Sequence, residues 1–270
     1  MIPLVSVIIP AQDEDLTACL ASLKKQNYKK IEIIVVRENL ERSIQRNLGA
    51  KKSCGEYLLF LDADMSVAKN LIACCVAKIE KENLAALYLP EKITGNSYWC
   101  QVRNFERSFY DGTVIDAVRF IKKNIFQKAG GFDEALTAGE DWDLDKKVRK
   151  IGPVALLNNS FLFHHEENFN LLNYLRKKSK YAKSLKDYRE KWVDTETQKQ
   201  FSFGYRYFGV FLENGKWQRF LKSPSLWPGL YFLRFLVGLN HLFKTGIFTY
   251  NIKPTVNVSQ IFLPVKFKGR

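Results

Sequence analysis

The stretch GEYLLFLDADM, residues 55–65, contains the pattern that decides the fold. Residues 57–61 are an apolar run of strand length, and two carboxylates, Asp62 and Asp64, follow it with one alanine between them. A carboxylate next to a dry core costs several kcal/mol unless a partner compensates its charge. The stretch therefore predicts a buried strand that ends at a site where two negative charges have partners.

Strand-like and helix-like segments alternate on both sides of this stretch. This alternation predicts an α/β fold with a parallel sheet covered by helices on both faces. Ligands of such sheets bind beyond the carboxyl ends of the strands, so Pro10, Arg37 and Asp62 are expected to border one crevice. The expected strands are residues 4–10, 31–36, 57–61 and 85–89, and the expected helices are 16–26, 43–54 and 70–82.

The pair Asp62 and Asp64 is typical of a site for a divalent cation and a nucleotide. Hard cations prefer carboxylate oxygens, and Mg²⁺ is usually held by one or two carboxylates together with substrate phosphates. A metal ion that bridges two phosphates neutralises charge on a departing diphosphate. Helix N-capping is the alternative explanation, and it accounts for one aspartate better than for two.

Four segments in a fixed order make the chain resemble the inverting glycosyltransferases of family 2, which have the GT-A fold. They are VSVIIPAQDED (5–15), SIQRNLGAKKSCGEYLLFLDADM (43–65), GGFDEALTAGEDWDL (130–144) and FLFHHEE (161–167). The resemblance implies a GT-A domain, Rossmann-like with a mostly parallel sheet, over residues 1–168. Its nucleotide-sugar half is expected up to about residue 90 and its acceptor half over 91–168, before a helical C-terminal region over 169–270.

The resemblance also implies a nucleotide-sugar donor, a Mn²⁺ or Mg²⁺ ion, and one direct displacement at the anomeric carbon. Asp62 is expected to face the ribose and the metal, and Asp64 and His164 to bind the metal. His165 is expected on the opposite face of its strand, because neighbouring strand residues alternate. The implied donor-binding residues are Pro10, Ala11, Glu14, Glu38, Arg46, Asn47, Asp62 and Asp64.

One segment departs from the family pattern. Relatives have DDGS-like acidic residues after the second strand, whereas this chain has VVRENLERS (35–43). Glu38 is expected to substitute for the missing carboxylate, or Arg37 to cover a different base. The Q-x-x-R-W motif of processive synthases is absent from the sequence, which favours transfer of a single sugar.

The segment GEDWDL (139–144) matches the family's catalytic base, which the resemblance places at Asp141. An attacking acceptor hydroxyl must lose its proton, and a positioned carboxylate can take it. Glu140 is expected to hold the base or to touch acceptor hydroxyls, and Trp142 to stack on a sugar. The alternatives are that the two acids begin a helix and that the tryptophan is a core aromatic.

The charge of the chain indicates an anionic partner. Its 270 residues include 42 Lys and Arg against 28 Asp and Glu, a formal charge of +14. No recognised nucleic-acid motif occurs, so nucleic acid is not an expected partner. The partners expected instead are a saccharide or lipid-linked saccharide acceptor and an anionic membrane surface.

The C-terminal region has a basic helical pattern at 171–192 and an apolar run at 226–243. Arg234 near the middle of the apolar run argues against a transmembrane helix. We expect an interfacial helix whose Arg234 reaches the lipid headgroups, with a buried docking helix as the alternative. Because the chain opens without a basic signal region, the expected location is cytoplasmic and peripheral, on the inner membrane face.

Two other functions compete with glycosyl transfer. A nucleotidyltransferase has a similar sheet, but it needs a glycine-rich basic phosphate loop where this chain has the acidic PAQDED (10–15). A non-catalytic, membrane-binding relative of the family is harder to distinguish from an active enzyme, because the segment VVREN (35–39) departs from the family pattern. Both alternatives stay open at the level of sequence.

Overall fold

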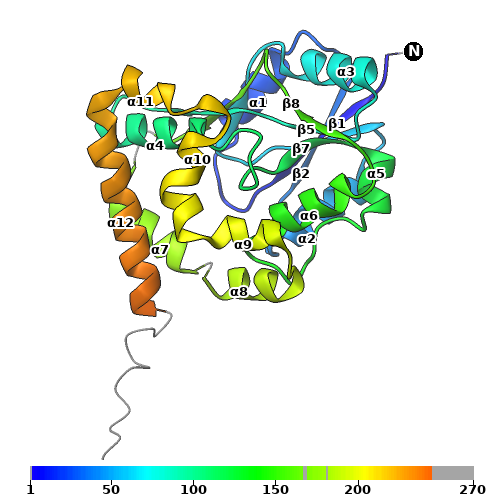
Figure 1. Cartoon of the computed structure of the whole chain (residues 1–270). Coiled ribbons are helices and arrows are strands. Elements are labelled where there is room, and N and C mark those ends of the chain that lie inside the picture. Colours follow the sequence, from blue (N-terminus) through cyan, green and yellow to red (C-terminus); the bar gives the residue numbers. More distant parts are fainter. Residues whose placement is uncertain (1, 167–168, 181, 245–270) are drawn as a thin grey trace, which may run out of the picture.

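The computed structural model describes residues 2–166, 169–180 and 182–244. A six-stranded sheet with the strand order β2-β1-β3-β7-β5-β8 lies at the centre of the first 165 residues (Figure 1). Its strands are β1 (Val5–Pro10), β2 (Ile31–Val36), β3 (Tyr57–Phe60), β5 (Ala86–Tyr88), β7 (Val118–Lys122) and β8 (Val154–Leu156).

The predicted α/β fold with a mostly parallel sheet is confirmed. Strands β2, β1 and β3 pair in parallel, and β5 pairs in parallel with β8. Strand β7 lies between β3 and β5 and is antiparallel to both, so the sheet is not parallel throughout. Phe120 of β7 pairs with Leu59 on one side and with Leu87 on the other. Strand β7 comes later in the chain, in a part of the sequence without the regular alternation.

Helices cover both faces of the sheet. Along β1 and β3, alternate side chains enter two separate cores, as the two-residue period of a strand requires. Helices α1 (Thr17–Lys24) and α3 (Leu71–Glu82) pack on one core. Helices α2 (Arg42–Lys52), α5 (Lys123–Lys128) and α6 (Glu140–Arg149) pack on the other.

Helix α2 lies unusually close to β1. A Cβ atom at Gly49 would lie 2.4 Å from the side chain of Ile8, so glycine permits this approach. The close packing fixes the helix that carries Arg46 and Asn47 against the sheet. Gly49, which follows Asn47 by two residues, thus has a packing role next to the candidate site.

A second, three-stranded sheet brings the last family segment to the first sheet's edge. Its strands are β4 (Met65–Val67), β9 (Leu162–His165) and β6 (Glu91–Thr94), in that order. Met65 pairs with His164 in the antiparallel ladder between β4 and β9. Because Asp64 directly precedes Met65, this register places the second aspartate of the pair beside the histidine.

The C-terminal region is helical and packs on α4. The basic helical pattern expected over 171–192 contains the helices α7 (Leu171–Lys180) and α8 (Ala182–Lys191). A shared aromatic and aliphatic cluster joins α4 to the later segments, and it includes Phe105, Phe109, Phe211 and Leu230. The elements of this part are α4 (Tyr98–Ser108), α7 (Leu171–Lys180), α8 (Ala182–Lys191), α9 (Thr195–Phe201), η1 (Tyr205–Gly209), α10 (Val210–Leu212), η2 (Glu213–Gly215), α11 (Gln218–Lys222), η3 (Pro224–Leu226) and α12 (Trp227–Lys244).

Helix α12 packs against α4 and α7, and its Arg234 does not face outward. The residue is 7% exposed, forms an ion pair of 3.1 Å with Glu106 of α4, and donates to the Tyr110 hydroxyl at 2.6 Å. The prediction that Arg234 reaches lipid headgroups is therefore wrong, because α4 supplies a buried counter-charge. Within the described ranges, every helix is too short or too polar to span a bilayer.

The Arg234–Glu106 pair makes a testable contribution to stability. Changing Arg234 to Met leaves Glu106 buried with Arg103 as its remaining cation at 2.7 Å. Breaking a buried pair typically costs about 3–5 kcal/mol, so we expect a loss of about 3 kcal/mol in urea unfolding. The control Phe235→Ser, on the exposed side of the same helix, should change the free energy of unfolding by about 0.5 kcal/mol or less. Equal stability of Arg234→Met and the wild type would contradict the buried pair.

Candidate active site

Arg46 lies at the centre of the candidate site. It projects from α2, is 1% exposed, and contacts three carboxylates from two other segments. Its guanidinium lies 2.8 Å from Asp62, 2.8 Å from Asp141 and 3.5 Å from Glu140. Burial alone would lower the pKa of Arg46, but the three negative charges outweigh it and raise the pKa. Arg46 is therefore a permanent cation that holds the end of β3 and the start of α6 together.

A second arginine, Arg119 of β7, completes the surroundings of Asp62. Its Nη1 lies 3.3 Å from Asp62 Oδ2, while Arg46 holds Oδ1. Burial would raise the pKa of Asp62, but the charges of Arg46 and Arg119 outweigh it and hold the pKa well below its ordinary value. Sequence reasoning missed Arg119, because nothing in the motif order indicates that β7 lies beside β3.

Asp64 and His164 form the part of the site that fits a metal ion. His164 Nε2 lies 3.1 Å from Asp64 Oδ2, and the Asp64 side chain is half exposed. His165 points to the other face of β9, where its ring nitrogens contact Ser66 at 2.9 Å and Thr94 at 3.1 Å. This alternation agrees with the expected orientation of the two histidines.

The donor set at Asp64 and His164 suits Mn²⁺ or Mg²⁺ completed by phosphate oxygens. Carboxylate oxygen and imidazole nitrogen are ligands that Mn²⁺-like ions accept, and phosphates supply the remaining positions. Among the residues that the structure describes, no group of three or more acids, histidines or cysteines could hold a metal ion by itself. Asp62, the residue expected to face the ribose and the metal, has both of its carboxylate oxygens in contact with arginines in this structure.

The loops after β1 and β2 are tied together at the same edge of the sheet. Gln45 Nε2 donates to the carbonyl oxygens of Ala11 at 3.0 Å and Glu38 at 2.6 Å. Arg37 Nη1 donates to the carbonyl oxygen of Gln12 at 2.6 Å. The structure therefore brings the expected donor loops next to each other, and Gln45 is a bracing residue that the motif comparison did not single out.

The remaining residues of these loops differ in their surroundings. Pro10 is buried at the end of β1, where it pairs with Val36 of β2. Glu14 is exposed and accepts a hydrogen bond from the Gln12 amide at 2.5 Å. The Glu38 carboxylate lies 3.3 Å from Lys52 and is accessible to solvent. Glu14 and Glu38 thus present carboxylates at the sheet edge, while Pro10 shapes the backbone.

Asn47 contacts the backbone of Phe132 with both ends of its side-chain amide. Its side-chain amide donates to the Phe132 carbonyl oxygen at 3.0 Å, and its oxygen accepts from the Phe132 amide at 3.0 Å. Gly131 has a φ of +69°, and a Cβ there would lie 2.7 Å from the Asn47 oxygen, so the position requires glycine. Asn47 therefore joins α2 to the turn formed by GGF, residues 130–132.

Glu140 and Asp141 lie in the first turn of α6, where a helix terminus favours negative charge. The Asp141 side chain is 37% exposed, whereas that of Glu140 is 10% exposed. Burial, and next the charge of Asp141, raise the pKa of Glu140 to about 7. Asp141 is therefore the carboxylate of the two that an acceptor hydroxyl can approach.

Trp142 is placed as a core aromatic. Its indole Nε1 donates to the Ile115 carbonyl oxygen at 3.2 Å. Its ring lies 5.7 Å from that of Tyr188 and 6.1 Å from that of Phe201, both in the C-terminal region. These contacts favour the core alternative over the expected sugar platform.

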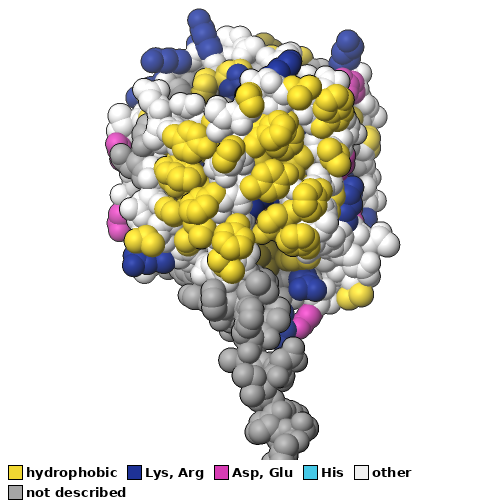
Figure 2. Space-filling model, turned by 60° about the vertical axis from the view of Figure 1, so that its left-hand side comes forward, with side chains coloured by type: hydrophobic (Ala, Val, Ile, Leu, Met, Phe, Trp, Pro, Cys, Tyr) yellow, Lys and Arg dark blue, Asp and Glu magenta, His cyan; other side chains and the backbone are white. Residues whose placement is uncertain are grey.

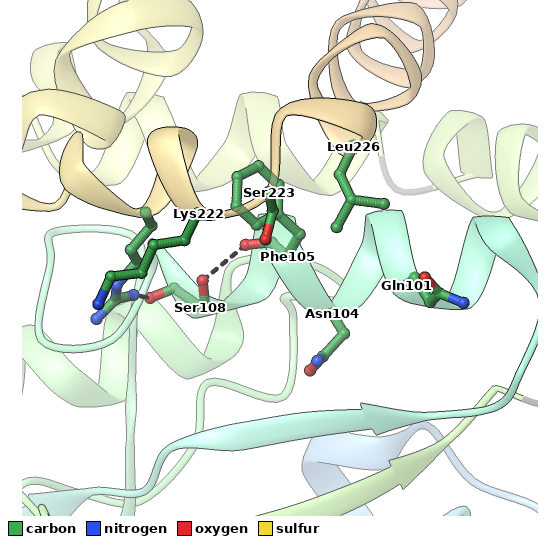
Figure 3. Close-up of a pocket in the computed structure, with 8 residues that line it drawn as sticks. Gln101, Asn104, Phe105, Ser108, Lys222, Ser223 and Leu226 are labelled. Carbon is green, nitrogen blue, oxygen red and sulfur yellow. Dashed lines mark hydrogen bonds between the residues drawn. The ribbon is translucent and has the colours of Figure 1, made fainter.

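A cavity of about 450 Å³ lies away from these residues, between α4 and the α11–η3 segment (Figure 3). It contains none of the residues expected to bind donor, metal or acceptor. Two cations, Arg219 and Lys222, are among the residues that line it. Its lining consists of Gln101, Asn104, Phe105, Ser108, Arg219, Lys222, Ser223 and Leu226.

Comparisons with known proteins concern the family and the fold. The family model described as Glycosyl transferase family 2 matches residues 37–132. The structure resembles the crystal structure of S. aureus TarS, with a TM-score of 0.53 and 16% identity, over 90% of this chain and 55% of that one. The chain thus spans just over half of the longer TarS structure.

Two structures of TarS residues 1–349 are also similar. One has a TM-score of 0.50 with 15% identity, and the other, a complex with UDP, has a TM-score of 0.50 with 13% identity. In both cases the match covers 91% of this chain and 91% of the other. At these identities the likeness concerns the fold. The comparison with curated proteins gave no match.

The raised pKa of Glu140 predicts a pH dependence of stability. Between pH 4.5, its ordinary pKa, and about 7, the folded state binds more protons at this residue than the unfolded state does. Glu140 therefore makes the free energy of unfolding fall as pH rises through this window. In urea titrations at pH 5 and 8, Glu140→Gln should lose less stability than the wild type, and the exposed control Glu190→Gln should follow the wild type. Parallel curves for wild type and Glu140→Gln would refute the assignment.

Proposed function

We propose that the chain is a member of glycosyltransferase family 2, whose model matches residues 37–132, and that it is a metal-dependent, inverting hexosyltransferase. It would move one sugar from a nucleotide-sugar donor to an acceptor hydroxyl. The observation that carries the proposal is the contact of one buried arginine, Arg46, with both Asp62 and Asp141. This contact joins the carboxylate expected at the nucleotide to the carboxylate expected at the acceptor. Asp64, two residues after Asp62, forms the proposed metal pair with His164 of β9.

The donor is proposed to bind along the loops after β1 and β2. The hydrogen bonds of Gln45 and Arg37 hold these loops together, which favours a preformed site for a nucleoside. A similar fold, that of TarS residues 1–349, was crystallised with UDP. We therefore propose a uridine diphosphate sugar as the donor, with Glu38 or Arg37 near the base and Asp62 near the ribose.

Asp64 and His164 would hold the metal ion. When bound with the donor, the metal supplies positive charge to the departing diphosphate. Asp62 contributes by its place between two arginines, which fixes the strand end that carries Asp64. The paired imidazole and carboxylate point toward each other across β4 and β9, so little rearrangement of these two side chains is needed.

Asp141 is proposed as the general base. The acceptor oxygen attacks the anomeric carbon, the bond from that carbon to the diphosphate oxygen breaks, and the hydroxyl proton passes to the Asp141 carboxylate. A single displacement inverts the configuration of the anomeric carbon. Arg46 orients the Asp141 carboxylate through one oxygen at 2.8 Å, and Glu140 lies behind it.

We also propose a lipid-linked or cell-surface saccharide as the acceptor, and a peripheral position on the cytoplasmic face of an anionic membrane. The positive charge supports this proposal, because all of the formal surplus lies in one part of the chain. Residues 169–270 contain 19 Lys and Arg against five Asp and Glu, whereas residues 1–168 contain 23 of each. A neutral catalytic part joined to a basic part suits a soluble donor and an anionic surface.

Replacing Asp141 by Asn tests the proposed reaction, because the change keeps the shape of the side chain and removes its basicity. Transfer from a nucleotide sugar should fall by about 10²–10⁴, the usual contribution of a general base. Calorimetry should show that UDP still binds. The same substitution at the exposed Asp187, Asp187→Asn, should leave turnover unchanged. Near-normal transfer by Asp141→Asn would remove Asp141 from the mechanism.

A further inference from the structure

An apolar face covers the outer side of the C-terminal region. Figure 2 shows hydrophobic side chains gathered over one broad face, on the side where α11 and α12 lie in Figure 1. Eight large hydrophobic residues within 33 positions are at least 36% exposed. They are Phe203, Phe208, Leu212, Trp217, Leu221, Trp227, Phe232 and Phe235. Exposed patches of this kind mark interaction surfaces.

Helix α12 has apolar residues on two sides, one buried against the protein and one exposed to solvent. Leu230 and Leu233 are buried in the cluster shared with α4. Phe232 and Phe235 point outward and are 48% and 57% exposed. The outward residues come from η1, α10 and α11 as well as from α12, so the surface is a product of folding and not of one amphipathic helix.

The charge of the region decides which partner this face suits. Residues 169–270 carry the entire formal surplus of +14. Two copies of such a region would repel each other, whereas an anionic bilayer would attract it. Arg219 and Lys222 belong to α11, the helix that also carries the exposed Leu221, so they place positive charge beside the face. Trp217 and Trp227 are of the residue type enriched at the headgroup level of membranes.

We propose that this apolar face, formed by η1, α10, α11 and α12, docks on the surface of an anionic lipid bilayer. Its phenylalanine and leucine side chains enter the boundary between headgroups and acyl chains. Arg219 and Lys222 contact lipid phosphates at the edge of the face. The protein then lies on the membrane without crossing it.

The face is connected to the proposed active site by a chain of ion pairs. Arg234 of α12 contacts Glu106 at 3.1 Å, and Arg103 contacts Glu106 at 2.7 Å and Glu166 at 3.3 Å. Glu166 follows His164 by two residues. Docking would therefore hold the proposed metal strand in a fixed position relative to the bilayer, which suits a lipid-linked acceptor. The docking deepens the peripheral position of the proposed function, and this last step rests on the proposed reaction as well.

Vesicle sedimentation tests the docking surface with the full chain. The wild type should bind vesicles that contain one-third phosphatidylglycerol, and should bind phosphatidylcholine vesicles at least tenfold more weakly. The triple variant Phe208→Ser, Leu221→Ser, Phe235→Ser removes exposed side chains from three elements, and it should lower affinity for anionic vesicles at least tenfold. The matched control Ile2→Ser, Ile151→Ser, Val193→Ser changes exposed hydrophobic residues outside the face and should bind as the wild type does.

Charge reversal tests the basic border. Lys222→Glu should weaken binding to anionic vesicles about tenfold, whereas Lys128→Glu, an exposed change on α5, should have little effect. Raising the salt concentration should weaken wild-type binding and reduce the difference between the two variants.

Three outcomes would overturn the proposal. The first is wild-type protein that stays in the supernatant with anionic vesicles at low salt. The second is a triple variant that binds as tightly as the wild type although its melting curve is unchanged. The third is dimerisation of the wild type in sedimentation velocity that the triple variant abolishes without any lipid binding, which would assign the face to a second copy of the chain. Transfer to a soluble acceptor is measured separately, so that loss of docking is distinguished from failure of the proposed reaction.

Discussion

The buried guanidinium of Arg46 is the interaction on which the candidate site depends. Removing a cation from water is costly, and three carboxylates compensate this one. Those carboxylates come from the end of β3 and the start of α6, while the arginine comes from α2. The need to pair one buried charge thus fixes three elements from distant parts of the sequence. The same Arg46 side chain contacts both Asp62, the carboxylate expected at the nucleotide, and Asp141, the expected base.

Much of this arrangement could be predicted from the sequence, because the relevant residues stand at the ends of recognisable elements. The apolar run before Asp62 indicates a strand end, and alternation of strands and helices brings such ends to one edge. The alternating faces of a strand also separate His164 from His165. These predictions depend on local patterns with periods of two or about 3.6 residues, which survive without knowledge of tertiary contacts.

Other features depend on contacts between distant segments, which local patterns do not contain. Strand β7 enters the sheet between β3 and β5 and brings Arg119 to Asp62. That second cation lies 3.3 Å from Asp62 Oδ2, beside the residue expected to face the ribose and the metal. Arg234 has the sequence surroundings of an interfacial residue, but Glu106 of α4 gives it a buried partner. Trp142 likewise finds its neighbours in a C-terminal region whose packing the sequence does not reveal.

The central claim is that Asp64 and His164 support metal-dependent transfer from a nucleotide sugar. It is tested most directly by the release of nucleoside diphosphate from a panel of UDP- and GDP-sugars, with Mn²⁺ or with a chelator. The account predicts release by the wild type from at least one UDP-sugar with Mn²⁺, and loss of that release with chelator or in folded Asp64→Ala. Absence of release from every donor, or release by Asp64→Ala equal to that of the wild type, would contradict it.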